Sequence, residues 1–305
     1  MPIPPVGWGA VEILIWDYYN SLKQMGHQVT IFNTKNIDTI IKSIEGASYD
    51  FVHIHYDVFY QLMPYLDCPK IAITSHYPYI DKREKHLMDG YGNIFDYLVK
   101  QREYYNFVLA DKDADMFIRC GADRDHIRKI KNGINSSMFR FSEEATLDKT
   151  VYLGKITPRK NQALFQDIEN IDFIGNCHDV HFKKSRYNYL GEWSRVQIYN
   201  KLTEYTNLLL ISDGEADPLV VKEALIAGLG VVINRSSAEN LDRNLKFITV
   251  IDDDKIGDIS FITRKLAENK EIAKRMRAQI REYGVQTFDI ETEVKKYVEI
   301  IENLL

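Results

Sequence analysis

The sequence has little that would point to a secreted or membrane-spanning protein. It holds only three cysteines in 305 residues, Cys68, Cys120 and Cys177, and their wide spacing excludes a disulfide framework and a cysteine-based zinc site. No apolar run reaches the roughly 18 residues that a membrane-spanning helix needs. Residues 1–5 have neither a basic start nor an apolar core, so we expect no signal peptide, a cytoplasmic location and at most weak membrane association.

Positive charge and familiar catalytic motifs are also scarce. Lysine and arginine number 39 against 44 aspartates and glutamates, a net charge of −5, whereas a nucleic-acid-binding protein usually has a basic surplus. The H-E-x-x-H, Walker A, C-x-x-C and G-x-S-x-G motifs do not occur. Three D-x-D pairs, at 113–115, 123–125 and 252–254, fall in an expected helix and two expected turns. We therefore expect neither a nucleic-acid partner nor a metal site.

What the sequence does contain is a regular alternation of strand-like and helix-like segments. Short apolar segments rich in β-branched residues predict strands over residues 28–32, 51–55, 71–74, 107–109, 126–130, 150–153, 171–174, 188–190, 208–211, 230–233 and 247–250. Amphipathic segments between them predict helices over residues 10–25, 36–45, 94–104, 112–120, 193–205, 219–227, 256–268, 270–283 and 290–305. This order predicts an α/β fold of right-handed βαβ units.

The length and one polar segment indicate two domains. At roughly 150 residues per domain, the chain has room for two, and the polar stretch around 142–148 separates two strand-like segments. We expect Rossmann-like domains at 1–141 and 142–287, facing each other across a cleft, and a helix at 288–305 that returns to the first domain. In such sheets ligands bind at the carboxyl ends of the strands.

The most informative local pattern is a pair of glutamates eight residues apart. Glu215 follows an expected strand and turn, whereas Glu223 lies inside the next expected helix, whose first turn suits Pro218. The free amides of Leu219 and Val220 would then point at an anion such as a diphosphate. Carboxylates beside a diphosphate are suited to accept hydrogen bonds from sugar hydroxyls. The alternative is an ordinary acidic helix start and a surface glutamate.

A second pattern is the basic turn that follows the first strand of the second half. Gly154 ends the strand, and Lys155, Arg159 and Lys160 surround a proline-containing turn. Lysine offers a point charge and arginine a bidentate fork, and both suit a diphosphate. The alternative is a basic surface turn.

Two weaker patterns lie in the first half. Gly7 and Gly9 form a Gly-x-Gly turn directly before an expected helix, where glycine permits a close approach of the backbone to an anion. His76 follows the strand at 71–74 and would lie at the ligand-binding edge of the sheet, although a lone histidine also serves as a structural hydrogen-bonding residue.

The order of these patterns resembles the retaining glycosyltransferases of family 4, which have the GT-B fold. The family opens with P-P-x-G-x-G-G-x-E, and residues 4–12 read PPVGWGAVE. Its L-x-x-x-G-H-x-V and V-x-x-N-G-I-D stretches are similar to LKQMGHQV at 22–29 and KIKNGIN at 129–135. Its G-R-x-x-x-x-K-G turn is similar to GKITPRKN at 154–161, with lysine in place of the arginine. Its E-G-F-G-x-x-x-x-E-A stretch is similar to EADPLVVKEA at 215–224. The family also has a strand before the opening motif, and here Met1 comes after that position, so either this version lacks the strand or the sequence starts late.

The resemblance implies an enzyme that transfers a sugar from a nucleotide-diphosphate sugar to an acceptor hydroxyl, with retention of anomeric configuration and without a metal or other cofactor. UDP is the first expectation for the nucleotide, with GDP or ADP as alternatives, and the acceptor would be a glycan or a lipid-linked molecule. Two other functions stay open. One is a catalytically silent subunit that binds a sugar nucleotide or a partner, and the other is a GT-B sugar-nucleotide epimerase.

By position in the motifs, the resemblance also implies a role for each site residue. Lys155, Lys160, the Gly9 backbone and the amides of Leu219 and Val220 would hold the diphosphate. Glu223 would bind the ribose, and the turn that begins at Leu190 would pack against the nucleobase. Glu215, His76 and Lys160 would form the catalytic group around the transferred sugar, with Arg159 as a further candidate cation.

Overall fold

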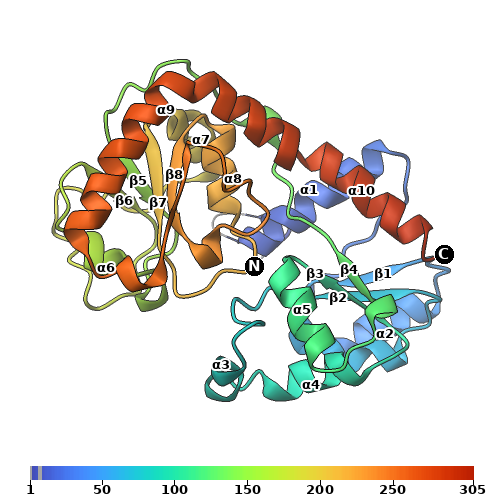
Figure 1. The fold of residues 1–305 in the computed structure, drawn as a ribbon. Helices are drawn as coiled ribbons and strands as arrows, with labels where there is room; N and C mark the ends of the chain where they lie inside the picture. Colours follow the sequence, from blue (N-terminus) through green and yellow to red (C-terminus); the bar gives the residue numbers. More distant parts are fainter. Residues whose placement is uncertain (1, 6–8) are drawn as a thin grey trace. The chain divides into compact units, whose positions relative to one another are not determined.

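The computed structural model describes residues 2–5 and 9–305, and it divides the chain into two compact units. The N-terminal unit comprises Met1–Gly133 together with Ile290–Leu305, and the C-terminal unit is Ile134–Asp289. Both units are α/β with parallel sheets, as the alternation of segments predicts (Figure 1). None of the helices formed by the described residues is both long and apolar enough to cross a membrane.

The division falls earlier in the chain than the predicted boundary at 141/142. Backbone hydrogen bonds explain this position. Ile134 N donates to Phe288 O over 2.8 Å, and Arg140 N donates to Tyr199 O over 2.9 Å. Residues 134–148 are therefore part of the C-terminal unit, although the polar stretch at 142–148 resembles a free linker between domains.

The N-terminal unit is built on a four-stranded parallel sheet in the order β1-β2-β3-β4. Its strands are β1 (Val52–Ile54), β2 (Ile71–Thr74), β3 (Tyr105–Val108) and β4 (Ile127–Lys129). Its helical elements are α1 (Ala10–Gln24), α2 (Ile37–Glu45), η1 (Asp57–Tyr65), α3 (Arg83–Met88), α4 (Gly92–Lys100), α5 (Asp111–Arg119), η2 (Arg124–His126) and α10 (Ile290–Glu302). The last helix, α10, packs against α1 within this unit.

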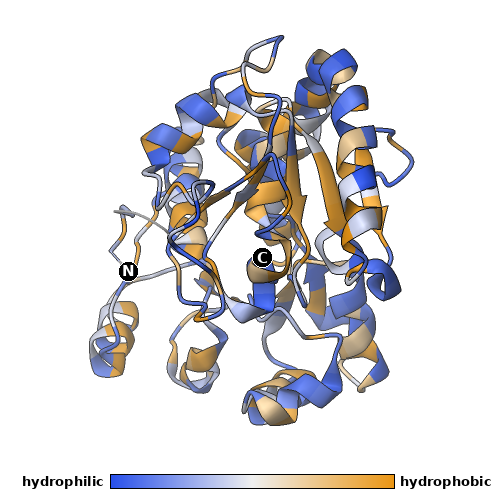
Figure 2. Cartoon of the chain, turned by 90° about the vertical axis from the view of Figure 1, so that its left-hand side faces the viewer, coloured by the Kyte–Doolittle hydropathy of each residue, from blue (hydrophilic) through white to orange (hydrophobic). Residues whose placement is uncertain are grey.

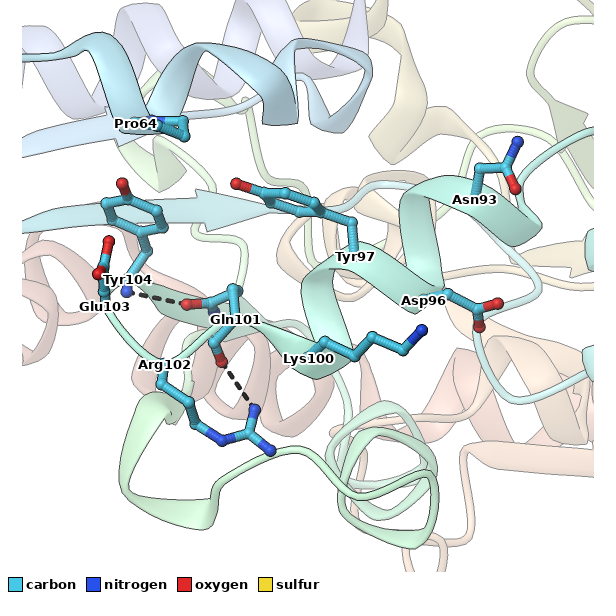
Figure 3. Close-up of a pocket in the computed structure, with 9 residues that line it drawn as sticks. All are labelled: Pro64, Asn93, Asp96, Tyr97, Lys100, Gln101, Arg102, Glu103 and Tyr104. Carbon is cyan, nitrogen blue, oxygen red and sulfur yellow. Dashed lines mark hydrogen bonds between the residues drawn. The ribbon is translucent and has the colours of Figure 1, made fainter.

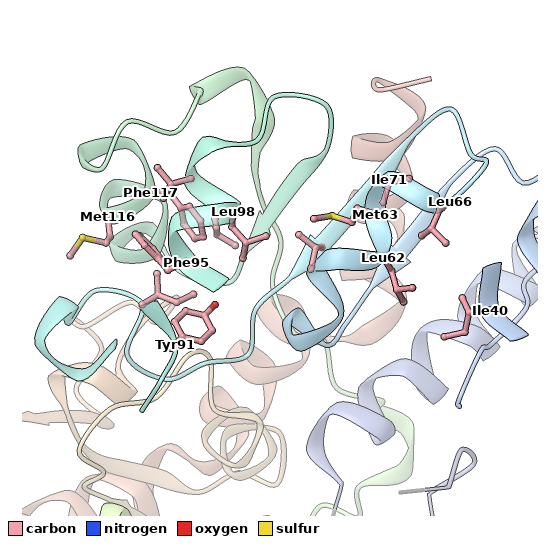
Figure 4. Close-up of a cluster of buried hydrophobic side chains, with 14 of the residues drawn as sticks. Ile40, Leu62, Met63, Leu66, Ile71, Tyr91, Phe95, Leu98, Met116 and Phe117 are labelled. Atoms are coloured by element: carbon pink, nitrogen blue, oxygen red, sulfur yellow. The ribbon is translucent and has the colours of Figure 1, made fainter. Parts of the chain in front are cut away.

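A buried apolar cluster holds one face of this sheet to its helices. Side chains from η1, α4 and α5 meet those of β2, with Met63 and Phe95 completely buried (Figure 4). Burial of apolar side chains is the main stabilising contribution to a domain of this size. This core fixes the position of the loops that leave β1 and β2.

The C-terminal unit contains a five-stranded parallel sheet in the order β6-β5-β7-β8-β9. Its strands are β5 (Thr150–Leu153), β6 (Ile171–Ile174), β7 (Asn207–Leu210), β8 (Gly230–Asn234) and β9 (Ile248–Ile251). Its helical elements are η3 (Ser136–Met138), η4 (Pro158–Lys160), α6 (Gln162–Phe165), α7 (Arg195–Lys201), η5 (Leu202–Glu204), α8 (Leu219–Ile226), η6 (Arg235–Ser237), η7 (Asp253–Lys255) and α9 (Ile259–Phe288). Figure 2 shows the strands as largely hydrophobic, whereas most helices carry both hydrophilic and hydrophobic residues.

The strand order of this sheet marks one position for a ligand. The chain runs from β5 outward to β6 on one side, and then returns to β7 on the other side of β5. Such a reversal is the topological switch point of a doubly wound sheet, and ligands bind at the carboxyl ends of the strands that flank it. The segments after β5 and β7 are therefore the expected ligand-binding loops of this unit.

Two predicted strands are wrong. Residues 28–32 make no strand pairing recorded in the described chain and alternate between exposed and half-buried positions. A backbone segment becomes a strand only when a neighbour satisfies its N–H and C=O groups. Residues 188–190 run beside β6 but form an isolated bridge between Tyr189 and Phe173 and not a strand of the sheet.

The predicted break between two C-terminal helices is also wrong, because α9 is continuous across Asn269. The side chain of Asn269 is completely buried, and its amide group donates to Val231 O, Phe247 O and Thr249 Oγ1 over 3.0–3.3 Å. A polar residue inside a helix is tolerated when its hydrogen bonds are made. The helical geometry is instead interrupted at Met276 (φ −121°, ψ 15°).

Candidate functional site

The structure brings the basic turn and the glutamate loop together beside the switch point. Lys160 ends η4 after β5, and Glu215 lies in the loop between β7 and α8. The Nζ of Lys160 is 3.2 Å from Oε1 of Glu215, and Arg159 NH1 is 3.4 Å from the same oxygen. The two patterns, more than 50 residues apart in the chain, therefore form one charged cluster.

Backbone contacts lock these two loops to each other. Asp213 N donates to Arg159 O over 2.8 Å, and the Arg159 guanidinium donates to Gly214 O. Tyr152 OH donates to Lys160 O and accepts from Ile211 N over 3.0 Å. The hydroxyl of a residue in β5 thus joins the turn after its own strand to the end of β7.

Glu215 is buried yet surrounded by cations. Burial alone would raise the pKa of Glu215, but the charges of Lys160 and then Arg159, with a hydrogen bond from Ser212, lower the pKa below its usual value. The carboxylate is therefore ionised at neutral pH. It can accept hydrogen bonds from a hydroxylated ligand while the cations stay fixed near it.

A second buried ion pair shapes the loop that leads from Glu215 into α8. Asp217 contacts Lys222 Nζ and accepts a 3.2 Å hydrogen bond from Asn240 Nδ2. The Lys222 ammonium also lies 5.1 Å from the ring centroid of Phe288. Asp217 therefore has a structural role here, at a position where the family motif has a different residue.

The beginning of α8 has the geometry expected of an anion-binding helix start. Pro218 is the N-cap and makes no side-chain cap bond, and the half-buried residues Leu219 and Val220 form the first turn. The N-terminal amides of a helix carry a partial positive charge. Among the predicted diphosphate ligands on this unit, Lys155 is exposed just after β5.

Two positions beside Lys155 favour glycine, both through a positive φ and one of them also through a close backbone approach. Gly154 has φ +145°, and a Cβ there would lie 3.5 Å from Lys160 Nζ. Gly175 has φ +153°, and a Cβ there would lie 1.9 Å from Gly154 O. The exits of β5 and β6 therefore touch through their backbones at Gly154 and Gly175, and no side chain fits at residue 175.

Glu223 has a cation partner that the sequence patterns did not reveal. Arg195, the first residue of α7, places NH1 2.8 Å from Oε1 of Glu223, and both side chains are largely buried. Arg195 is distant from Glu223 in the sequence and matches no motif, so no sequence signal could have identified it. Leu190, the predicted nucleobase contact, is exposed in the turn before α7.

The remaining predicted site residues belong to the N-terminal unit. Gly9 is the buried N-cap of α1, and its carbonyl accepts from Ile13 N over 2.8 Å. Gly7, the other glycine of the motif, lies outside the described residues. His76 follows β2 and stacks on His55, with ring centroids 5.9 Å apart.

His76 is part of a cluster of three imidazoles. The rings of His53 and His55 are 3.9 Å apart, and His53 hydrogen-bonds Tyr297 OH through Nδ1 and Thr74 Oγ1 through Nε2. Burial, and then the proximity of His76, lowers the pKa of His53 to about 3. Burial lowers the pKa of His55 well below its usual value in the same way. These two rings are therefore neutral at physiological pH.

A cavity of about 660 Å³ lies elsewhere in the N-terminal unit. It is lined by the end of α4 and the following loop, including Tyr97, Arg102 and Tyr104 (Figure 3). None of the predicted site residues lines it. Within the described part of the chain, no group of three or more His, Cys, Asp or Glu side chains is arranged to hold a metal ion.

Comparisons with known proteins identify the fold. Neither a protein-family model nor a curated protein sequence matches the chain. Solved structures do match over nearly the whole chain. Anabaena HepE in complex with UDP-glucose has a TM-score of 0.73 at 13% identity, covering 98% of this chain and 97% of that chain. Sucrose-phosphate synthase from Thermosynechococcus elongatus has a TM-score of 0.74 at 14% identity, covering 97% and 94%.

A third similar structure is AviGT4, a glycosyltransferase involved in avilamycin A biosynthesis, with a TM-score of 0.65 at 16% identity and coverage of 100% and 92%. At these identities the likeness concerns the arrangement of the elements and not the reaction. The chain thus has the two-domain α/β fold of the GT-B glycosyltransferases.

Proposed function

We propose that this protein is a glycosyltransferase that moves a sugar from a nucleotide-diphosphate sugar to an acceptor hydroxyl. The observation that carries this proposal is the meeting of Lys160 and Glu215 at the switch point between β5 and β7. A cation for a phosphate and a carboxylate for sugar hydroxyls lie side by side, at the position where doubly wound sheets bind nucleotides. We further propose that the anomeric configuration is retained and that no metal ion is required.

The diphosphate would be held by positive groups of the C-terminal unit. Lys160 is fixed by Glu215, whereas Lys155 is exposed and available to a ligand. The first-turn amides of Leu219 and Val220 supply further positive charge. As the glycosidic bond breaks, the leaving diphosphate gains negative charge, and preorganised cations and amides stabilise that charge in the transition state. These groups are the reason for proposing that the reaction proceeds without a metal.

The sugar end of the donor would be held by carboxylate and imidazole groups. We assign Glu215 to orientation of the transferred sugar, because its ionised carboxylate is rigidly placed beside Lys160. We assign Glu223 to the ribose hydroxyls and the turn at Leu190 to the nucleobase. Gly9 and His76 of the N-terminal unit are assigned, by the family resemblance alone, to the diphosphate and to the sugar near the reacting carbon.

The similar structures support a choice of donor and acceptor to test first. HepE was solved with UDP and with UDP-glucose, and this supports UDP as the nucleotide to test first, with GDP and ADP as alternatives. WaaG is a glycosyltransferase involved in lipopolysaccharide biosynthesis, with a TM-score of 0.67. It supports a glycan or lipid-linked acceptor for this protein.

A turnover assay tests the proposal. The purified protein is incubated with UDP-hexoses and a panel of glycan and lipid-linked acceptors, with and without EDTA, and UDP release and product configuration are measured. We expect retained configuration, no effect of EDTA, and a loss of about 100-fold or more in kcat for Glu215→Gln. Glu239→Gln, at a more exposed glutamate of the same unit, is the matched control.

Other outcomes would separate the alternatives. Binding of the donor without any turnover would identify a catalytically silent subunit. Conversion of the donor sugar without an acceptor would identify an epimerase. Unchanged turnover in both Glu215→Gln and Lys160→Met would show that the site is assigned wrongly.

A further inference from the structure

The ion pair between Arg195 and Glu223 joins the two segments that would enclose the nucleoside. Glu223 lies in α8, and Arg195 is the first residue of α7, immediately after the turn at residues 190–193. Arg195 NH1 lies 2.8 Å from Oε1 of Glu223, with side chains 17% and 6% exposed. Among the described residues, Arg195 is the one hydrogen-bonding or ion-pairing partner of the Glu223 carboxylate, and it contacts one of the two oxygens.

Arg195 is held firmly on its own side. Its guanidinium carbon lies 4.7 Å from the ring centroid of Tyr199, and Nε donates to Tyr199 OH over 3.3 Å. Ser194 and Gln197 form a capping box at the start of α7, with Gln197 N donating to Ser194 Oγ over 3.3 Å. The guanidinium is therefore set in place before any ligand arrives.

The turn before Arg195 is tied to the sheet as well. Leu190 N donates to Phe173 O over 2.9 Å, and Gly175 N donates to Gly191 O over 2.8 Å. These two hydrogen bonds attach the turn to the carboxyl end of β6, beside the backbone contact between Gly154 and Gly175. Arg195 consequently connects a rigid turn on one side to the α8 carboxylate on the other.

We propose that Arg195 is a positioning residue for nucleotide selectivity. It would fix the Glu223 carboxylate so that the second oxygen accepts hydrogen bonds from ribose hydroxyls, which makes the protein prefer ribonucleotides to 2′-deoxyribonucleotides. This inference rests on the proposed function. A buried carboxylate that loses its cation partner is strongly destabilised and would move away from this position, out of reach of the ribose hydroxyls.

The planar guanidinium group of arginine suits this positioning role better than the ammonium group of lysine. Its planar fork contacts Glu223 through one nitrogen while it stacks on Tyr199 and bonds the phenol through another. Lysine would keep the charge but lose the stacking and the fixed direction of its donors. Arg195→Lys should therefore keep the ion pair and lose part of its directional control.

The experiment compares UDP with 2′-deoxy-UDP by isothermal titration calorimetry. A hydrogen bond to a charged group corresponds to a preference of about 10- to 100-fold for UDP in the wild type. We expect Glu223→Gln and Arg195→Gln to lose most of this preference, and Arg195→Lys to lose part of it. The double variant should be no less selective than Glu223→Gln alone, because Arg195 acts through Glu223.

The ratio of the two affinities separates positioning from simple stabilisation. A purely structural role would weaken UDP and 2′-deoxy-UDP equally and leave their ratio unchanged, and this result would overturn the inference. Arg243→Gln, which removes a more exposed ion pair of the same unit, should leave the ratio at the wild-type value.

The titrations distinguish failure of the proposed function from failure of this inference alone. If the wild type binds neither nucleotide, the proposed function fails and this inference fails with it. If the wild type prefers UDP and the Arg195 variants keep the full preference, only the inference fails. If Arg195→Gln does not fold, Arg195→Lys and Tyr199→Phe test the inference in its place. Tyr199→Phe removes only the hydrogen bond between the phenol and Nε of Arg195. It should lower the preference for UDP while the ion pair with Glu223 stays.

Discussion

Lys160 Nζ lies 3.2 Å from Oε1 of Glu215, and this contact joins two loops that leave neighbouring strands of one sheet. Arg159 reaches the same oxygen over 3.4 Å. One buried carboxylate thus organises two cations at the switch point. The arrangement makes the site rigid before ligand binding, which is what electrostatic stabilisation of a leaving diphosphate requires.

Removing Lys160 should destabilise the protein as well as weaken ligand binding. Lys160→Met leaves Glu215 buried with Arg159 as its remaining lysine or arginine partner, so we expect the free energy of unfolding at pH 7 to fall by about 3 kcal/mol. Urea titrations measure the change, with Lys184→Met at an exposed site as control. Adding Glu215→Gln should recover part of the loss. A stable single variant would show that the pair contributes little.

The ion pair between Asp217 and Lys222 gives a second test of buried charge. Both side chains are inaccessible to solvent, so Lys222→Met should cost about 3–5 kcal/mol of unfolding free energy. Arg235 and Asp252 form an exposed pair at 2.7 Å, and Arg235→Met should cost at most about 1 kcal/mol. Equal losses in thermal or urea unfolding would contradict the assigned difference in burial.

Gly175 should tolerate no side chain. Its Cβ would meet Gly154 O at 1.9 Å and its φ is +153°, so Gly175→Ala combines backbone strain with a clash and should cost about 3 kcal/mol or more. Gly191 also has a positive φ of +72° but has open space around it, so Gly191→Ala should cost only about 1 kcal/mol. Unfolding measurements that rank the two variants in the opposite order would show that the β5 and β6 exits do not touch.

The neutral histidines predict how stability depends on pH. Burial, and then the nearby His53 and His76, keeps the pKa of His55 well below 6.5 in the folded chain, whereas the unfolded chain titrates near 6.5. The unfolded state therefore binds more protons below pH 6.5. The stability is complete above that pH and falls as the pH drops, by about 1.4 kcal/mol per pH unit for each such histidine.

His55→Phe should reduce this dependence. The phenyl ring keeps the stacking but cannot be protonated, so the slope of unfolding free energy between pH 6 and pH 5 should decrease by about 1.4 kcal/mol per pH unit. His27→Phe, at an exposed histidine, is the matched control for the substitution itself. An unchanged slope in His55→Phe would mean that His55 is protonated in the folded protein.

The secondary structure around the site could be predicted from the sequence, whereas most tertiary contacts could not. The strand before Glu215 and the helix after Pro218 could be predicted, because periodicity and proline placement are local signals. The strand expected at 28–32 could not be excluded in the same way, because a strand also needs a partner. The helix through Asn269 was equally hidden, because the bonds that satisfy its amide come from β8 and from the segment around β9.

The residues of the candidate site could also be predicted singly, whereas their contacts with one another could not. The motif resemblance selected Glu215 and Lys160 separately, and only the sheet order shows that they meet. Arg159 was a secondary candidate by spacing, yet its contact with Glu215 is nearly as close as that of Lys160. Arg195 has no motif, and its pairing with Glu223 depends on how α7 and α8 pack.

A panel of nucleotide sugars shows whether the site around Lys160 and Glu215 binds such a ligand. The thermal unfolding of the wild type and of Lys160→Met is recorded with UDP, GDP and ADP sugars, each at saturating concentration. We predict that a UDP sugar raises the Tm of the wild type by about 5 °C or more, because a ligand that binds only the folded state stabilises it. The shift should be much smaller in Lys160→Met. Absence of a shift with every nucleotide sugar would show that the protein does not bind nucleotide sugars.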